Sequence, residues 1–142
     1  MSDLPRLLAI CGMAIGLAGP AWAQTADAGA ACPVSTRPMA RLELFFGAAR
    51  VSGGVVSAEE WEAFLDAEVT PRFPEGLTWF EGRGQWRGRD GAVVREATRM
   101  LIVWTEAGAT TEAAIEAIRS AYRARFDQES VLRVNGWSCV TF

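Results

Sequence analysis

The sequence contains no histidine and no lysine, because all 14 of its basic residues are arginines. Without an imidazole there is no histidine general base, no Ser-His-Asp triad and no histidine ligand for zinc. Without a lysine amine there is no Schiff-base chemistry. Phosphate-binding loops, metal-ligand spacings and cofactor fingerprints are also missing. The sequence therefore predicts neither a metal nor a cofactor, and any enzyme chemistry would have to use carboxylates for acid–base work with arginine as a charged partner.

An excess of positive charge is missing as well. The chain has 17 acidic residues and a net charge of −3, and its arginines are scattered except for a small group at Arg83, Arg87 and Arg89. Proteins that bind nucleic acid or anionic lipid through charge usually concentrate basic residues on one surface. We therefore expect no nucleic-acid partner.

Long hydrophobic runs are absent except near the start of the chain. Residues 7–19 are apolar, Pro20 follows them, and Ala21-Trp22-Ala23 is a small-x-small cleavage site. A run of about 13 residues is too short for a bilayer, which needs roughly 20. A lipoprotein leader is disfavoured because the bulky Ile10 precedes Cys11. We predict a signal peptide over residues 1–23 and a periplasmic or secreted protein with no membrane span after cleavage.

Cysteine is scarce, and its number is informative. Of the three cysteines, Cys11 lies in the predicted leader, which leaves Cys32 and Cys139. An even number of cysteines in an oxidising compartment is usually paired, although two inert buried thiols are the alternative. We predict a disulfide between Cys32 and Cys139.

The rest of the chain predicts a single α+β domain over residues 41–142, after an extended lead-in over residues 24–40. Alternating apolar residues predict strands at 41–46, 77–86, 92–105 and 131–134. Helices are expected to begin at Ser57, which has Glu60 at the capping-box spacing, and at Thr110 or Thr111. Gly82 and Gly84 suggest a bulge, and Asn135-Gly136 is typical of a tight turn into a short extra C-terminal strand at 137–142.

This order of elements predicts a ferredoxin-like split β-α-β sandwich, with a mainly antiparallel sheet and two helices on one face. The first and third strands should be central. The uncovered face would carry apolar residues, among them Phe45, Leu101 and Val103 on one phase. Self-association into a homodimer would cover that face, and so would the terminal strand or residues 24–40 within one chain.

Seven residues are candidates for a binding site: Arg72, Gln85, Trp86, Arg95, Glu96, Gln128 and Ser130. Arg72 lies between two prolines and could hold a carboxylate or bond local carbonyls. Glu96 and Glu81 could divide acid–base roles or form cross-strand salt bridges. Residues 128–130 could line a pocket or cap a turn. For each of these the structural role is the commoner one, and the strand aromatics (Trp79, Phe80, Trp86, Trp104 and Trp137) are expected to pack in the core.

Several blocks of the sequence resemble a known family. The blocks are residues 41–47 (RLELFFG), 60–61 (EW), 69–78 (VTPRFPEGLT), 84–87 (GQWR), 95–96 (RE) and 128–133 (QESVLR). Their order is similar to that of a family of small exported bacterial proteins known only as a domain of unknown function. The resemblance implies one compact domain behind a leader, and it brings no activity or catalytic residue. Its blocks include Arg72, Gln85 and Gln128.

Two functions from different classes fit the sequence. The first is a non-catalytic binding or interaction module of the cell envelope, with an unknown small molecule or an envelope protein as its partner. The second is a small lyase- or isomerase-like enzyme that uses carboxylates and arginine without histidine, lysine or metal. The first is favoured because no nucleophile–base pair is visible, and we assign no catalytic residue.

Overall fold

A computed structural model describes residues 32–142, which form one compact unit. The predicted signal peptide and the predicted lead-in up to residue 31 lie outside the described residues. Within residues 32–142, no helix is both long and apolar enough to cross a membrane.

Four antiparallel strands form one open sheet. They are β1 (Arg37–Gly47), β2 (Thr78–Arg87), β3 (Val93–Thr105) and β4 (Leu132–Val140), in the spatial order β2-β3-β1-β4. This is the strand order of a ferredoxin-like sandwich, with β1 and β3 at the centre as predicted. The fold prediction is confirmed.

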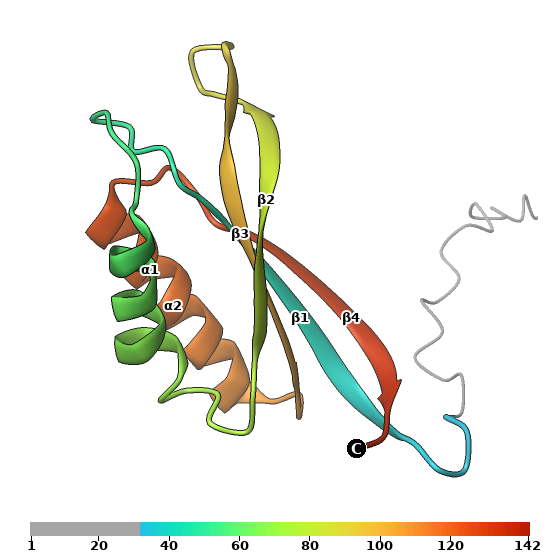
Figure 1. Ribbon diagram of the computed structural model, residues 1–142. Helices are drawn as coiled ribbons and strands as arrows, with labels where there is room; N and C mark the ends of the chain where they lie inside the picture. The colour runs from blue at the N-terminus through green and yellow to red at the C-terminus, as the bar shows by residue number, and fades with distance from the viewer. Residues whose placement is uncertain (1–31) are drawn as a thin grey trace, which may run out of the picture. The chain divides into compact units, whose positions relative to one another are not determined.

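The helices lie together on one side of the sheet (Figure 1). They are α1 (Ala58–Phe64), which continues into the π-helix η1 (Leu65–Val69), and α2 (Ala109–Phe126). The predicted capping box is present: the Glu60 N–H donates to Ser57 Oγ at 3.2 Å, and the Ser57 N–H donates to Glu60 Oε2 at 3.0 Å. A local signal was sufficient here because both partners belong to one turn.

The core lies between the helices and the inner face of the sheet. Alternation in β1 directs Leu42, Leu44 and Phe46 toward the helices, and all three are buried. Phe46 contacts an aromatic cluster whose members also include Trp61, Phe64, Tyr122 and Phe126. Complete burial of one such side chain contributes about 1.5–3 kcal/mol, so this cluster is a main source of the stability that holds the sheet in place.

Three local predictions are wrong because contacts across the sheet override local signals. Asn135 and Gly136 do not turn; they pair with Leu42 and Arg41, so β4 is one continuous strand without an extra C-terminal strand. The register of β2 with β3 is uninterrupted at Gly82 and Gly84, so no bulge forms. Helix α2 begins after Gly108, and the Thr111 hydroxyl donates to the Glu106 carbonyl at 2.8 Å instead of capping.

The predicted disulfide is present between Cys32 and Cys139, whose Cα atoms are 5.5 Å apart. The end of the predicted lead-in is already strand, because β1 begins at Arg37 and pairs there with Val140. The segment that contains Cys32 and strand β4 therefore lie side by side at one edge of the sheet, as the sequence prediction requires.

The other face of the sheet carries an apolar row that crosses all four strands. Phe45 pairs with Met100 and Leu132, and Met100 pairs with Phe80. Leu101 and Val103, which the sequence grouped with Phe45, instead share the helix-facing side with Leu44 and Leu42. We call the side that bears Phe45, Phe80, Met100 and Leu132 the open face.

Most of the strand aromatics are not core residues, contrary to the prediction. Trp79 does pack against Trp61, with ring centroids 5.6 Å apart. Phe80, Trp86 and Trp137 are exposed by 47%, 36% and 65%. Phe80 and Trp86 lie on the open face and Trp137 lies on the edge strand β4, so the two helices reach none of them.

Candidate functional site

A pocket of about 320 Å³ lies where β1 ends and β3 begins, and we call it the β1-end pocket. Five of the seven predicted site residues line it: Gln85, Trp86, Glu96, Gln128 and Ser130. The remaining lining residues are Phe45, Gly47, Arg83, Gly84, Thr98, Glu129 and Leu132. Residues far apart in the sequence therefore meet at one concave site.

Glu96 is the polar centre of this pocket. The Trp86 indole Nε1–H donates to Oε1 at 2.6 Å, and the Ala49 backbone N–H donates to Oε2 at 2.7 Å. Each of the two oxygens therefore accepts one hydrogen bond from the protein. Glu96 is thus held in place as an acceptor.

Gly47 makes room for this carboxylate. A Cβ atom at position 47 would lie 2.6 Å from Glu96 Oε1, which is closer than real contacts allow. The small residue at the end of β1 therefore sets where the Glu96 side chain can lie. Sequence reasoning did not include Gly47 or Ala49, although a glycine that closes a predicted strand is a signal of close approach.

The segment after α2 forms another wall of the pocket. Helix α2 ends at Asp127, whose left-handed φ of 50° turns the chain toward the sheet. The Gln128 side-chain amide then donates to the Ala49 carbonyl at 2.6 Å. One peptide segment at Ala49 is thereby joined to both Glu96 and Gln128. Next to it, Glu129 pairs with Arg89 at 3.3 Å.

The pocket combines an apolar wall with a few polar groups. Phe45, Leu132 and Trp86 provide the apolar wall, and they continue the open face. The Ser130 hydroxyl makes no hydrogen bond within residues 32–142, nor does the Gln128 Oε1 atom. These two groups are therefore available to a ligand.

Two predicted residues lie elsewhere. Arg72 pairs with Glu68 at 2.9 Å and also bonds the Glu68 carbonyl, which is the local role weighed from the sequence. Arg95 is the cross-strand partner of Gln85, and both alternate with the residues that point into the pocket. The side chains of Arg95 and Gln85 therefore project from the opposite side of the hairpin, and of these two residues only Gln85 also lines the pocket.

The possible pair of catalytic carboxylates is not formed. Glu81 pairs with Arg99 at 3.1 Å, on the helix-facing side, while Glu96 points to the other side. Tyr122 lies beneath the site and donates its hydroxyl to the Gly47 carbonyl at 2.9 Å. Burial raises the pKa of Tyr122 to about 12, so this phenol stays protonated at neutral pH.

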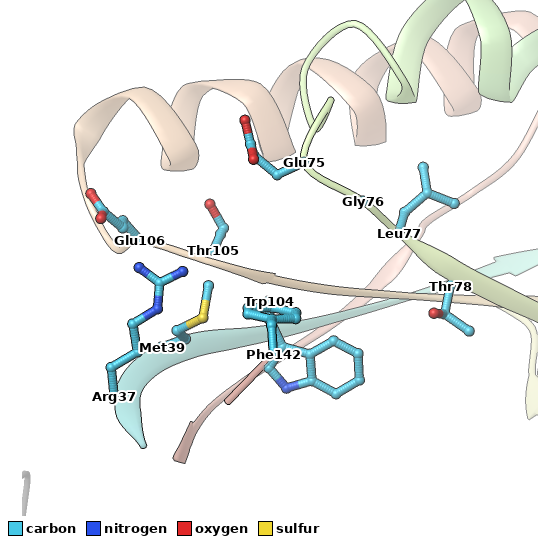
Figure 2. A pocket seen from close by; sticks show the side chains of 10 residues that line it. All are labelled: Arg37, Met39, Glu75, Gly76, Leu77, Thr78, Trp104, Thr105, Glu106 and Phe142. Atoms are coloured by element: carbon cyan, nitrogen blue, oxygen red, sulfur yellow. The ribbon is translucent and has the colours of Figure 1, made fainter. Parts of the chain in front are cut away.

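A second pocket, of about 720 Å³, lies at the opposite end of the sheet (Figure 2). Its lining includes Arg37, Met39, Glu75, Trp104 and Phe142, and none of the seven predicted residues. Arg37 lies 6.0 Å from the centre of the Phe142 ring. Phe142 is 95% exposed, so few neighbouring residues hold this side of the pocket in place. Sequence reasoning missed this pocket because its walls come from four segments that are far apart in the sequence, at residues 37–39, 75–78, 104–106 and 142.

Solved structures with the same fold have little sequence in common with this chain. A phage SAM lyase in complex with S-methyl-5'-thioadenosine is 16% identical, covers 73% of this chain and 90% of its own, and has a TM-score of 0.59. A phage SAM lyase in the apo state is 16% identical, covers 74% and 90%, and has a TM-score of 0.53. CutA from Synechococcus elongatus is 12% identical, covers 75% and 80%, and has a TM-score of 0.44. At 16% identity, the likeness to the two SAM lyase structures shows the fold alone.

The family resemblance noted in the sequence is confirmed. No curated protein matches this chain at a significant level. The family model described as "Protein of unknown function (DUF3574)" matches residues 41–142, which is well over half of the chain and includes every residue of the β1-end pocket. The chain therefore belongs to the DUF3574 family.

Proposed function

We propose that the protein is a non-catalytic binding module of the cell envelope and that the β1-end pocket is its ligand site. The observation that supports this most is the state of Glu96. Each of its two oxygens accepts a hydrogen bond, one from the Trp86 indole and one from the Ala49 backbone, so Glu96 is held in a fixed position and shapes the wall of the pocket. The predicted leader and the disulfide support a periplasmic or secreted location.

The ligand we infer is a small neutral molecule with one flat apolar face and several hydroxyl or amine donors. The apolar face would lie against Trp86, Phe45 and Leu132. The donors would reach Ser130 Oγ and Gln128 Oε1. A volume of about 320 Å³ is at the lower end of small-molecule sites, which favours a ligand of one or two rings.

A thermal-shift screen against envelope metabolites and sugars tests this proposal. A ligand of the β1-end pocket should raise the unfolding temperature of the parent protein and of Thr78→Trp, which fills the opposite pocket of Figure 2. It should leave Ser130→Trp unshifted, because the indole would occupy the β1-end pocket.

The two variants form a matched pair, since each replaces an exposed small hydroxyl residue with tryptophan. A hit that survives Ser130→Trp but is lost in Thr78→Trp would move the site to the opposite pocket and contradict the proposal. Retention of every hit in both variants would contradict it too.

The lyase- or isomerase-like alternative has weaker support. Its best candidate group is Glu129, whose carboxylate is 24% exposed and pairs with Arg89 at the pocket rim. Arg89 itself is 83% exposed, so water screens this ion pair and weakens it. The phage SAM lyase shares the fold at only 16% identity, which does not carry its chemistry to this chain. Turnover of S-adenosylmethionine by the parent protein that is lost in Glu129→Gln would favour this alternative.

We also propose that the open face pairs with a second copy of the chain. Phe80 is 47% exposed and Leu132 is 58% exposed, at the two edges of the apolar row. Beside the apolar row, Arg41 and Glu43 pair with each other at 2.8 Å, so this part of the face would meet a second copy without net repulsion. Light scattering should give the mass of a dimer for the parent and of a monomer for Phe80→Arg.

Val55→Arg is the control for this experiment, since Val55 is 69% exposed in a loop away from the sheet. It should remain dimeric. A monomeric parent protein at high micromolar concentration would refute the pairing.

A further inference from the structure

Another polar surface lies on the helix-facing side of the hairpin formed by β2 and β3. The far end of this hairpin extends past both helices (Figure 1), so the helices do not cover it. Strand alternation places four exposed side chains together on this side: Arg83, Gln85, Arg87 and Arg95. We call them the arginine face.

The register brings the three arginines close to one another. Arg95 pairs directly with Gln85, while Arg83 and Arg87 lie two residues before and after Gln85 on the same strand. Directly opposed residues are about 5 Å apart and diagonal ones about 7–8 Å, which an arginine side chain can span. Three guanidinium groups can therefore reach one point above Gln85. A hollow of about 890 Å³ along this part of the hairpin is lined by Arg83, Gln85 and Arg95, together with Glu81, Glu96 and the small residues between them.

These arginines differ from most others in the domain, because none of the three has a carboxylate partner within residues 32–142. Arg50, Arg99 and Arg133 each pair with a glutamate at 2.6–3.1 Å. On the arginine face, Arg87 bonds only the Gly91 carbonyl, at 2.9 Å. The nearby carboxylates are engaged elsewhere, Glu96 on the other side of the hairpin and Glu81 with Arg99.

Like charges at neighbouring positions on a sheet repel one another, so three uncompensated arginines are unfavourable unless an anion joins them. The three arginines form a local excess of positive charge in a chain whose net charge is −3. We propose that the arginine face binds the phosphate group of a phosphoester. Guanidinium groups donate paired N–H bonds to phosphate oxygens, and the Gln85 amide adds a donor at the centre.

A tetrahedral phosphate accepts hydrogen bonds from several directions at once, whereas one or two guanidinium groups satisfy a planar carboxylate. Three arginines around one amide therefore fit a phosphate better than a carboxylate. Arg83 and Gln85 also line the β1-end pocket, whereas Arg87 and Arg95 belong to the arginine face alone.

Calorimetric titration of tripolyphosphate into the purified protein tests the site. The double variant Arg83→Gln/Arg95→Gln should bind about tenfold more weakly or worse, since each lost charged hydrogen bond costs about 1.5–3 kcal/mol and about 1.4 kcal/mol is a factor of ten. The control is Arg123→Gln/Arg125→Gln on α2, which removes the same charge from two arginines that also lack carboxylate partners within residues 32–142. It should stay within about twofold of the parent.

If both double variants bound tripolyphosphate equally weakly, the attraction would come from the overall charge and the site would be overturned. A parent protein that does not bind tripolyphosphate would also overturn it. Circular dichroism melting checks that all variants fold. Co-sedimentation with phosphatidylglycerol vesicles, with phosphatidylcholine vesicles as the control, tells whether the bound phosphate belongs to a lipid or to a soluble molecule. Binding to phosphatidylglycerol that is lost in Arg83→Gln/Arg95→Gln assigns a lipid headgroup, and binding to tripolyphosphate alone assigns a soluble phosphoester.

Discussion

Among single residues, Gly47 determines the shape of the β1-end pocket. The Glu96 carboxylate occupies the space that a side chain at position 47 would need, and it receives hydrogen bonds from Trp86 and Ala49 there. The geometry of this site therefore depends on the absence of a methyl group at position 47 as well as on its hydrogen bonds.

Gly47→Ala should therefore destabilise the fold and displace Glu96. We expect a loss of about 1–3 kcal/mol in the free energy of unfolding, the usual cost of overpacking. Urea denaturation measures this loss. The Trp86 indole N–H resonance should shift as well, because its acceptor moves away.

Gly136→Ala is the matched control for Gly47→Ala. It lies in β4 with no atom within 4 Å of the added methyl group, so its effect should stay within about 0.5 kcal/mol. Equal losses in the two variants would contradict the role given to Gly47.

The site was predictable at the residue scale only in part. Trp86 and Glu96 belong to one hairpin. Their closeness in space follows from the turn between the two predicted strands. The Ala49 N–H that fixes Glu96 is 47 residues away along the chain. Such a backbone partner carries no side-chain signal, so sequence reasoning could not find it.

At the element scale, an ion-pair network links α2 to β4. Arg133 on β4 bonds Glu112 at 2.6 Å and Glu116 at 3.3 Å, both on α2. The hydrogen bond from Arg133 lowers the pKa of Glu112 below its ordinary 4.5. Hydrogen bonds from Arg119 first, and then from Arg133, lower the pKa of Glu116.

These pKa shifts predict an acid-dependent loss of stability. A carboxyl group whose pKa is lower in the folded state binds fewer protons there than in the unfolded state. Its contribution is complete above the ordinary pKa of 4.5 and is lost as the pH falls through the lower, folded value. The unfolding temperature of the parent should therefore fall in acid, and that of Arg133→Met should fall less steeply.

Arg123→Met is the control for this pH series, because Arg123 bonds only Ser120 and the Arg119 carbonyl within residues 32–142. Its pH profile should run parallel to that of the parent. A profile of Arg133→Met that is also parallel would show that the network contributes nothing to acid stability.

Sequence reasoning located an element correctly where the interactions that fix the element lie within a few residues of one another. Ser57 and Glu60 cap α1 through bonds inside one turn, and this start was predicted. Asn135-Gly136 has the strongest local turn signal, yet it lies within a strand. The reason is non-local: β1 extends from Arg37 to Gly47, and its backbone pairs with β4 past that point.

For the whole molecule, the disulfide joins the two ends of the described domain. Cys32 and Cys139 are separated by 107 residues, so the bridge restricts the unfolded chain strongly. The chain-entropy model allows about 4–5 kcal/mol for a loop of this size. Neither cysteine belongs to the hydrophobic core, so the reduced protein should still fold.

Cys32→Ser/Cys139→Ser should keep its circular dichroism spectrum and lose up to about 4–5 kcal/mol in the free energy of unfolding. Intact mass after alkylation, with and without reductant, reports the bridge directly in the parent protein. Two free thiols in the unreduced sample would contradict it.

The same bridge determines how the molecule can be mounted on a surface. It lies at the end of the sheet where Arg37 pairs with Val140, while Gly47 and the β1-end pocket lie at the other end of the 11-residue strand β1, roughly 33 Å away. A tether attached at Phe142 would therefore leave the pocket and the hairpin directed away from the support. Biosensor experiments with the C-terminally immobilised protein should reach both sites unhindered.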